Sequence, residues 1–119
     1  MVLYLGIDAG GTASKARLVD ANGLRLGAGK AGPANTRIGL DALHRSLLDA
    51  CTQALKDGGV ADSDYGSVRV GMGIAGINRM GMKQQIQALD FPFANVQLTS
   101  DSIIANLGAH MGGDGAILI

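Results

Sequence analysis

The order of the apolar runs constrains the fold of this chain more than any other feature of its sequence. Three strand-like runs come first, at residues 2–7, 13–20 and 24–30, and glycine-containing turns separate them. The second turn contains Asn22-Gly23, a pair typical of tight hairpins because such turns need positive φ angles. The chain is therefore predicted to open with a three-stranded antiparallel meander.

Helices and strands are predicted to alternate after this meander. Apolar residues at helical spacing predict a long helix over residues 40–57, which Gly58-Gly59 would end as a left-handed cap. One face of this helix carries Leu43, Leu47, Leu48, Cys51, Ala54 and Leu55. The later elements are a strand at 68–74, a helix at 78–89, a strand at 96–99, a helix at 102–111 and a strand at 115–119.

This pattern predicts an α/β fold with a mixed sheet. The meander would form an antiparallel edge, and the later strands a parallel part covered by helices. Ligands of such sheets gather at the carboxyl ends of the parallel strands. Asp8 and Asp101 each follow or end a predicted strand. Both carboxylates are therefore expected at one edge of the sheet.

Composition narrows the classes of function. Ten basic residues balance ten acidic ones, and only 3% of the 119 residues are aromatic, which argues against nucleic acid as a partner. All the acidic residues are aspartates, so a general base or metal carboxylate in this chain is an Asp. The single cysteine, Cys51, excludes a disulfide within the chain and is expected to be a buried helix residue. No leader or membrane-spanning run is visible, and we expect a cytoplasmic protein with no membrane partner.

A glycine pattern at residues 71–76, Gly-Met-Gly-Ile-Ala-Gly, matches the dinucleotide-binding fingerprint but lacks its context. The fingerprint glycines follow a strand and open a helix. Here Gly71 and Gly73 fall inside the predicted strand, and no acid stands about twenty residues further on. Two other interpretations stay open. The strand glycines would let another element approach closely, or Gly76 would line a ligand cleft at the strand end.

The segment Asp8-Ala-Gly-Gly-Thr12 lies between two strands that are predicted to pair. Glycines at such a turn allow backbone N–H groups to converge on one point, where they bind phosphate oxygens. Thr12 adds a hydroxyl donor, and Lys15 is a candidate neighbour of the phosphates. Asp8 would act through Mg²⁺, because a carboxylate repels phosphate. From the spacing alone, an ordinary glycine hairpin with a surface aspartate explains the segment equally well.

Two other polar segments carry candidate site residues. Asp101 follows a predicted strand and opens a predicted helix, so it is either an N-cap or a carboxylate that accepts a proton from an attacking hydroxyl. The loop at residues 32–36 contains Asn35. It is either a turn built from Pro and Asn or a sugar-binding loop, because an Asn amide pairs well with sugar hydroxyls.

Taken together, four stretches at residues 6–23, 32–39, 70–77 and 99–119 resemble one family along nearly the whole chain. They occur in the order typical of N-acetylglucosamine and glucosamine kinases, which belong to the BadF/BadG/BcrA/BcrD ATPase family of the actin, hexokinase and Hsp70 superfamily. The resemblance implies an RNase H-like fold. It also implies that residues 1–119 are the N-terminal lobe of a two-lobed kinase and lack kinase activity by themselves.

The resemblance also implies a role for each matching residue. Gly10, Gly11 and Thr12 look like the first phosphate loop for ATP, and Asp8 like the acid that positions Mg²⁺. Asn35 and Gly76 look like parts of the sugar site. Asp101 resembles the base that contacts and activates the C6 hydroxyl of glucosamine or N-acetylglucosamine.

The full-length protein is expected to be a homodimer that uses ATP and an amino sugar. Two alternatives stay open at this point. One is an activator ATPase of the same family, which carries cysteines for an iron–sulfur cluster. The other is a non-catalytic sugar-sensing module.

Overall fold

The computed structural model describes residues 3–35, 37–79 and 81–99. The helix predicted over residues 102–111, the strand predicted over 115–119 and Asp101 lie outside these ranges. The elements are the strands β1 (Leu3–Ala9), β2 (Ser14–Asp20), β3 (Arg25–Ala31), β4 (Val68–Ile74) and β5 (Asn95–Thr99), the helices α1 (Leu40–Asp57) and α2 (Met82–Gln87), and the 3₁₀ helix η1 (Asp62–Ser67).

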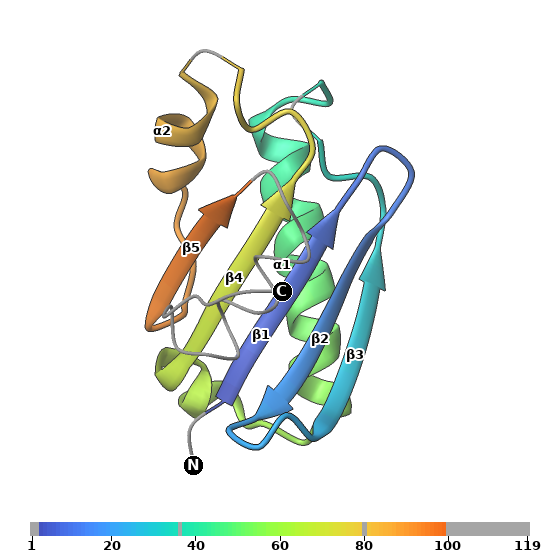
Figure 1. Ribbon diagram of the computed structural model, residues 1–119, viewed down its shortest axis with the longest axis vertical. Helices are drawn as coiled ribbons and strands as arrows, with labels where there is room; N and C mark the ends of the chain where they lie inside the picture. The colour runs from blue at the N-terminus through green and yellow to red at the C-terminus, as the bar shows by residue number, and fades with distance from the viewer. Residues whose placement is uncertain (1–2, 36, 80, 100–119) are drawn as a thin grey trace.

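The five strands of the described residues form one mixed sheet in the order β3-β2-β1-β4-β5 (Figure 1). The strands β1, β2 and β3 pair antiparallel, while β4 runs parallel to both β1 and β5. This arrangement confirms the predicted meander and the predicted parallel part. The carboxyl ends of β1, β4 and β5 therefore lie at the same edge of the sheet.

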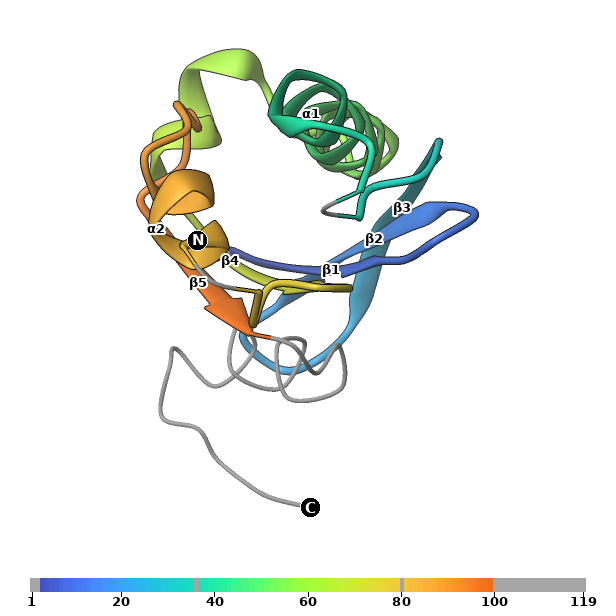
Figure 2. The same cartoon turned by 90° about the horizontal axis from the view of Figure 1, so that it is seen from above.

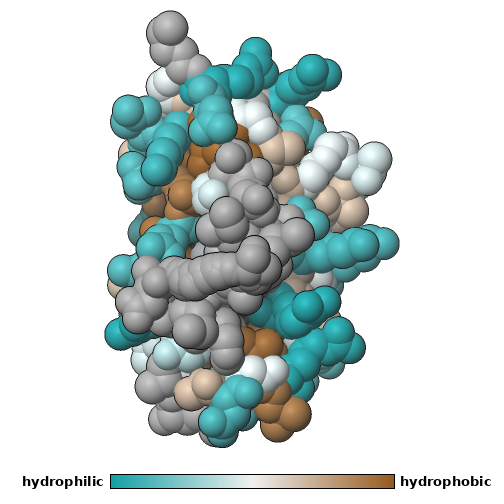
Figure 3. All heavy atoms as spheres, in the orientation of Figure 1, coloured by the Kyte–Doolittle hydropathy of each residue, from teal (hydrophilic) through white to brown (hydrophobic). Residues whose placement is uncertain are grey.

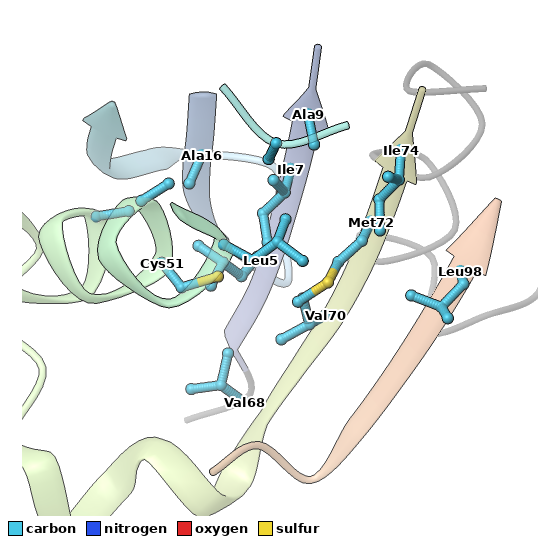
Figure 4. Close-up of a cluster of buried hydrophobic side chains, with 14 of the residues drawn as sticks. Leu5, Ile7, Ala9, Ala16, Cys51, Val68, Val70, Met72, Ile74 and Leu98 are labelled. Atoms are coloured by element: carbon cyan, nitrogen blue, oxygen red, sulfur yellow. The ribbon is translucent and has the colours of Figure 1, made fainter. Parts of the chain in front are cut away.

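The helices α1 and α2 cover the same face of the sheet, as the view from above shows (Figure 2). Alternate residues of the strands point to that face. Leu5 and Ile7 of β1 and Val70 and Met72 of β4 are buried there together with Cys51 of α1 (Figure 4). Burial raises the pKa of the Cys51 thiol, so this cysteine packs as a small apolar side chain.

The long helix α1 has the bounds that the sequence predicts. Its end forms a Schellman motif, in which the N–H of Val60 donates to the carbonyl oxygen of Leu55 and the N–H of Gly59 to that of Lys56. Gly59 takes the left-handed conformation with φ of 77°, whereas Gly58 does not. The glycine pair therefore ends the helix as predicted, with the left-handed residue at its second position.

Close packing joins β3 to α1. A Cβ on Gly27 or on Gly29 would lie 2.3 Å from a carbonyl oxygen of α1, that of Ala54 or Ala50 respectively. The glycine face of β3 therefore meets the helix, while Leu24, just before the strand, is exposed. The pairing of β2 with β3 shifts its register between Leu18 and Val19.

The outer edge of β3 is also closed by α1. The backbone N–H of Ala28 donates to Asp57 Oδ2 at 2.9 Å, and that of Lys30 donates to Gln53 Oε1 at 3.2 Å. Side chains of the helix thus occupy donors that an edge strand would otherwise offer to another chain.

One prediction about the connections was wrong in its bounds. The helix expected at residues 78–89 is shorter, because Gly81 has a positive φ angle of 76°, which breaks helical geometry just before Met82. The connection between α1 and β4 contains the 3₁₀ helix η1, whose Tyr65 is buried against the core.

Candidate functional site

Three loops meet at the carboxyl ends of β1 and β4. They are the turn at residues 10–13, the loop at residues 32–39 and the loop at residues 75–79. Backbone hydrogen bonds join them: the N–H of Ala34 donates to Gly10 O at 3.1 Å, and that of Ala75 donates to Ala9 O at 3.0 Å. Asn35 also forms an isolated parallel bridge with Ala75. The loops are therefore held in fixed relative positions.

A buried serine adds a side-chain tie to this loop cluster. Ser14, the first residue of β2, is fully buried, and its hydroxyl donates to Gly32 O at 2.8 Å. This bond connects the start of β2 to the loop that carries Asn35.

A hollow of about 370 Å³ opens between the three loops. Its lining includes three of the predicted site residues, Gly11, Asn35 and Gly76, each from a different loop. The fold thus brings residues from three separate sequence stretches into one cleft at the predicted edge of the sheet. Arg37 and Arg79 complete the polar lining.

Within the described part of the chain, the turn after β1 has two backbone N–H groups without a backbone partner. Gly10 uses its own N–H, which donates to Ala13 O at 3.0 Å, so this glycine shapes the turn. Gly11 and Thr12 are exposed, and among the described residues their N–H groups have no backbone partner. A Cβ on Gly11 would meet no described atom within 4 Å. The space above this turn is open, as a phosphate cradle requires.

Asn35 is oriented by its own loop. Its side-chain oxygen accepts the backbone N–H of Arg37 at 2.8 Å, in an Asx turn. The amide NH₂ is not used in this bond, and no partner for it is found among the described residues, so it is a candidate donor for a ligand hydroxyl.

Gly76 begins the loop after β4 in a left-handed conformation, with φ of 84°. Its carbonyl oxygen accepts the N–H of Arg79 at 3.1 Å. The glycine therefore reverses the chain at the strand end and brings Arg79 to the cleft.

Asp8 lies in a different hollow. Its exposed side chain points to the face of the sheet opposite the helices, where a hollow of about 520 Å³ is also lined by Lys15, Arg17, Arg25 and Lys30. Figure 3 shows hydrophilic side chains over β2 and β3 on this face. Asp8 therefore lines the hollow on the open face of the sheet, whereas Gly11 lines the hollow between the three loops.

Asp8 is a candidate Mg²⁺ ligand that would act together with substrate phosphates and water. Within residues 3–99, leaving out 36 and 80, no three His, Cys or Asp side chains group as a metal site. Magnesium, however, is commonly held by one or two carboxylates together with substrate phosphates and water. A single exposed carboxylate next to the turn at residues 10–13 fits that donor set.

Asp101 lies outside the described residues, so the structure does not place it. The strand that precedes it, β5, pairs in parallel with β4, with Thr99 opposite Gly73. The chain thus leaves β5 at the edge where the hollow opens.

The structure also bears on the dinucleotide pattern. Gly71 and Gly73 lie within β4, and the next helix begins only at Met82. The pattern is therefore not a strand–turn–helix fingerprint, in agreement with the sequence interpretation.

Sequence reasoning missed Arg37 and Arg79. Each is a single arginine in a polar loop, and such residues are usually solvated surface positions. Only the loop geometry, which places both beside Asn35 and Gly76, marks them as site residues.

Comparisons with known proteins identify relatives of this chain in sequence and in fold. The chain is 40% identical over all 119 residues to the glucosamine kinase GspK of Vibrio cholerae serotype O1, of which it covers 40%. Its fold matches a putative N-acetylglucosamine kinase from Chromobacterium violaceum with a TM-score of 0.76 at 24% identity, over 94% of this chain and 39% of that one. It also matches the ROK hexokinase from Thermus thermophilus with a TM-score of 0.60 at 20% identity, over 93% and 38% of the two chains.

The chain thus spans about two fifths of the length of these relatives. None of the described helices is long and apolar enough to cross a membrane. The family model of the BadF/BadG/BcrA/BcrD ATPases matches residues 5–119, and this chain belongs to that family.

Proposed function

We propose that this chain is the N-terminal lobe of an ATP-dependent amino-sugar kinase of the cytoplasm that phosphorylates the C6 hydroxyl of glucosamine or N-acetylglucosamine. One observation carries the proposal. Gly11 of the phosphate turn and Asn35 and Gly76 of the predicted sugar site line a single hollow. The likeness to the glucosamine kinase of Vibrio cholerae supports the same substrate class.

The residues have complementary roles in this reaction. The N–H groups of Gly11 and Thr12 bind phosphate oxygens of ATP, and the Asn35 amide donates to a sugar hydroxyl. Asp101 accepts the proton of the C6 hydroxyl as its oxygen forms a bond to the γ-phosphorus. The bond from that phosphorus to the bridging oxygen breaks, and its electron pair leaves on ADP. Mg²⁺, held through Asp8, would neutralise charge on the phosphates.

The structure also bears on the alternative activator ATPase. That class needs cysteines that can reach a cluster, whereas Cys51 is fully buried between α1 and the sheet. The one cysteine of this chain is therefore unsuited to bind an iron–sulfur cluster. The homodimeric assembly of the full-length protein stays a prediction.

Replacing Asp101 tests the proposal in the full-length protein. We expect Asp101→Asn to lower kcat by roughly 10²–10⁴-fold, because a general base contributes about that factor. Sugar affinity, measured by calorimetry, should change little. The panel of acceptors is glucosamine, N-acetylglucosamine, N-acetylmuramate and glucose. A wild-type protein that phosphorylates none of them, or a variant with unchanged kcat, would contradict the proposal.

A further inference from the structure

Two arginines stand on opposite loops of the same hollow. Arg37 belongs to the loop before α1 and Arg79 to the loop after β4, and both line the hollow with Gly11. Both side chains are exposed. Both arginines are therefore solvent-accessible residues of the cleft lining.

The backbone of each arginine is held by a site residue. The N–H of Arg37 donates to Asn35 Oδ1 at 2.8 Å, and the N–H of Arg79 donates to Gly76 O at 3.1 Å. The carbonyl oxygen of Arg79 also accepts the N–H of Met82, the first residue of α2, at 3.0 Å. The two cations thus start from anchored turns, which lowers the entropy cost of placing them on a ligand.

The described lining of this hollow is positively charged. It contains two arginines and no acidic residue. Among the described residues neither arginine forms an ion pair or a side-chain hydrogen bond, so both guanidinium groups keep their donors for a ligand. The N–H groups of Gly11 and Thr12, which lack a backbone partner in the described ranges, add donors at the same end. Guanidinium and backbone N–H groups together match a phosphate, whose oxygens accept bidentate hydrogen bonds from arginine.

We propose that Arg37 and Arg79 bind the phosphoryl group that moves from ATP to the sugar, and retain it as the 6-phosphate of the product. The inference rests on the proposed kinase function and adds two catalytic residues to it. During transfer the sugar oxygen bonds to the γ-phosphorus, its proton goes to Asp101, and the bond to the bridging oxygen breaks with its electron pair on ADP. The arginines stabilise negative charge on the transferred oxygens.

The test compares two ligands that differ only in the phosphate. In the full-length protein, calorimetry measures the affinity for the amino sugar and for its 6-phosphate. We expect Arg37→Gln and Arg79→Gln each to weaken binding of the 6-phosphate about tenfold and of the unphosphorylated sugar less than twofold. Arg79→Lys, which keeps the charge and loses the bidentate geometry, should lie between Arg79→Gln and the wild type.

Turnover gives a second readout. The Gln variants should lower kcat by about tenfold or more and leave KM for the sugar nearly unchanged, because their contacts form to the transferred group. Arg45, an exposed residue of α1 that lines neither hollow, supplies the control, and Arg45→Gln should match the wild type in both measurements.

The outcomes separate this inference from the function on which it rests. If the wild type phosphorylates the sugar but the Gln variants bind the 6-phosphate as tightly as it does, the inference is wrong and the kinase function stands. Equal weakening of sugar and sugar phosphate would also overturn it, because that pattern indicates a distorted cleft. A wild type that neither binds nor phosphorylates an amino sugar would overturn both.

Discussion

Two pairs of glycines differ sharply in their surroundings. One pair is Gly27 and Gly29 of β3, and the other is Gly10 and Gly11 of the turn after β1. A Cβ on either glycine of β3 would lie 2.3 Å from a backbone oxygen of α1. On Gly10 the nearest described atom would be 3.5 Å away, and on Gly11 none would lie within 4 Å. Neither pair has a positive φ. The first pair is therefore required by packing, whereas the described residues leave space for a side chain at the second pair.

The largest effect is expected at the packed glycines. Gly29→Ala should lower the free energy of unfolding of the full-length protein by about 3 kcal/mol, because the new methyl group overlaps the Ala50 carbonyl and the helix must shift. Denaturant unfolding measures the change. The matched control is Gly66→Ala, where a Cβ meets no described atom within 4 Å, and it should stay within about 0.5 kcal/mol of the wild type. Equal losses of unfolding free energy in Gly29→Ala and Gly66→Ala would show that close packing against α1 does not set Gly29 apart.

A change at the open glycines should affect activity and leave stability intact. Gly11→Val should reduce kcat/KM for ATP about a hundredfold, since its side chain would fill the space over the phosphate turn, and a hundredfold is about 2.7 kcal/mol. Unfolding free energy should change by less than about 0.5 kcal/mol. Gly66→Val, in η1 at the other end of β4, serves as the control for activity. A destabilised but fully active Gly11 variant would show that this glycine serves the fold.

The smallest effect is expected at the buried tie between β2 and the Asn35 loop. Ser14→Ala removes a donor to the Gly32 carbonyl and should cost about 1 kcal/mol of unfolding free energy. Because the loop carries Asn35, KM for the sugar should also rise a few-fold. Ser67→Ala breaks a bond of the same 2.8 Å length to Asp64 O on the exposed surface and should change neither quantity. If both variants behave alike, the tie does not position the loop.

Sequence patterns predicted the main elements because these depend on local signals. The periodic apolar residues and the glycine pair predicted the observed bounds of α1. The Asn22-Gly23 pair predicted the turn between β2 and β3, in which Gly23 has a φ of 85°. The strand β4 was likewise predicted at its observed residues. The short helix α2 was overestimated, because apolar spacing does not reveal which glycines adopt left-handed angles.

The candidate site was predictable only in part, since chain order says little about which loops share a cavity. Gly11, Asn35 and Gly76 could be named in advance from their motifs and from the family resemblance, and they do line one hollow. The sequence grouped Asp8 with the phosphate glycines, whereas the pleat of β1 turns its side chain to the open face of the sheet. Arg37 and Arg79 carried no signal at all.

The sequence by itself determined the fold class, the order of the described elements and the membership of the family, and it supplied the candidate residues for phosphate and sugar binding. Those properties follow from local backbone preferences and from apolar periodicity, which act over a few residues at a time. Only the tertiary structure decided which glycines pack against a helix and which face open space, and that two arginines distant in sequence share a cleft with the phosphate turn. The shared cleft depends on the parallel pairing of β1 with β4, which brings loops from far apart in the chain to one edge of the sheet.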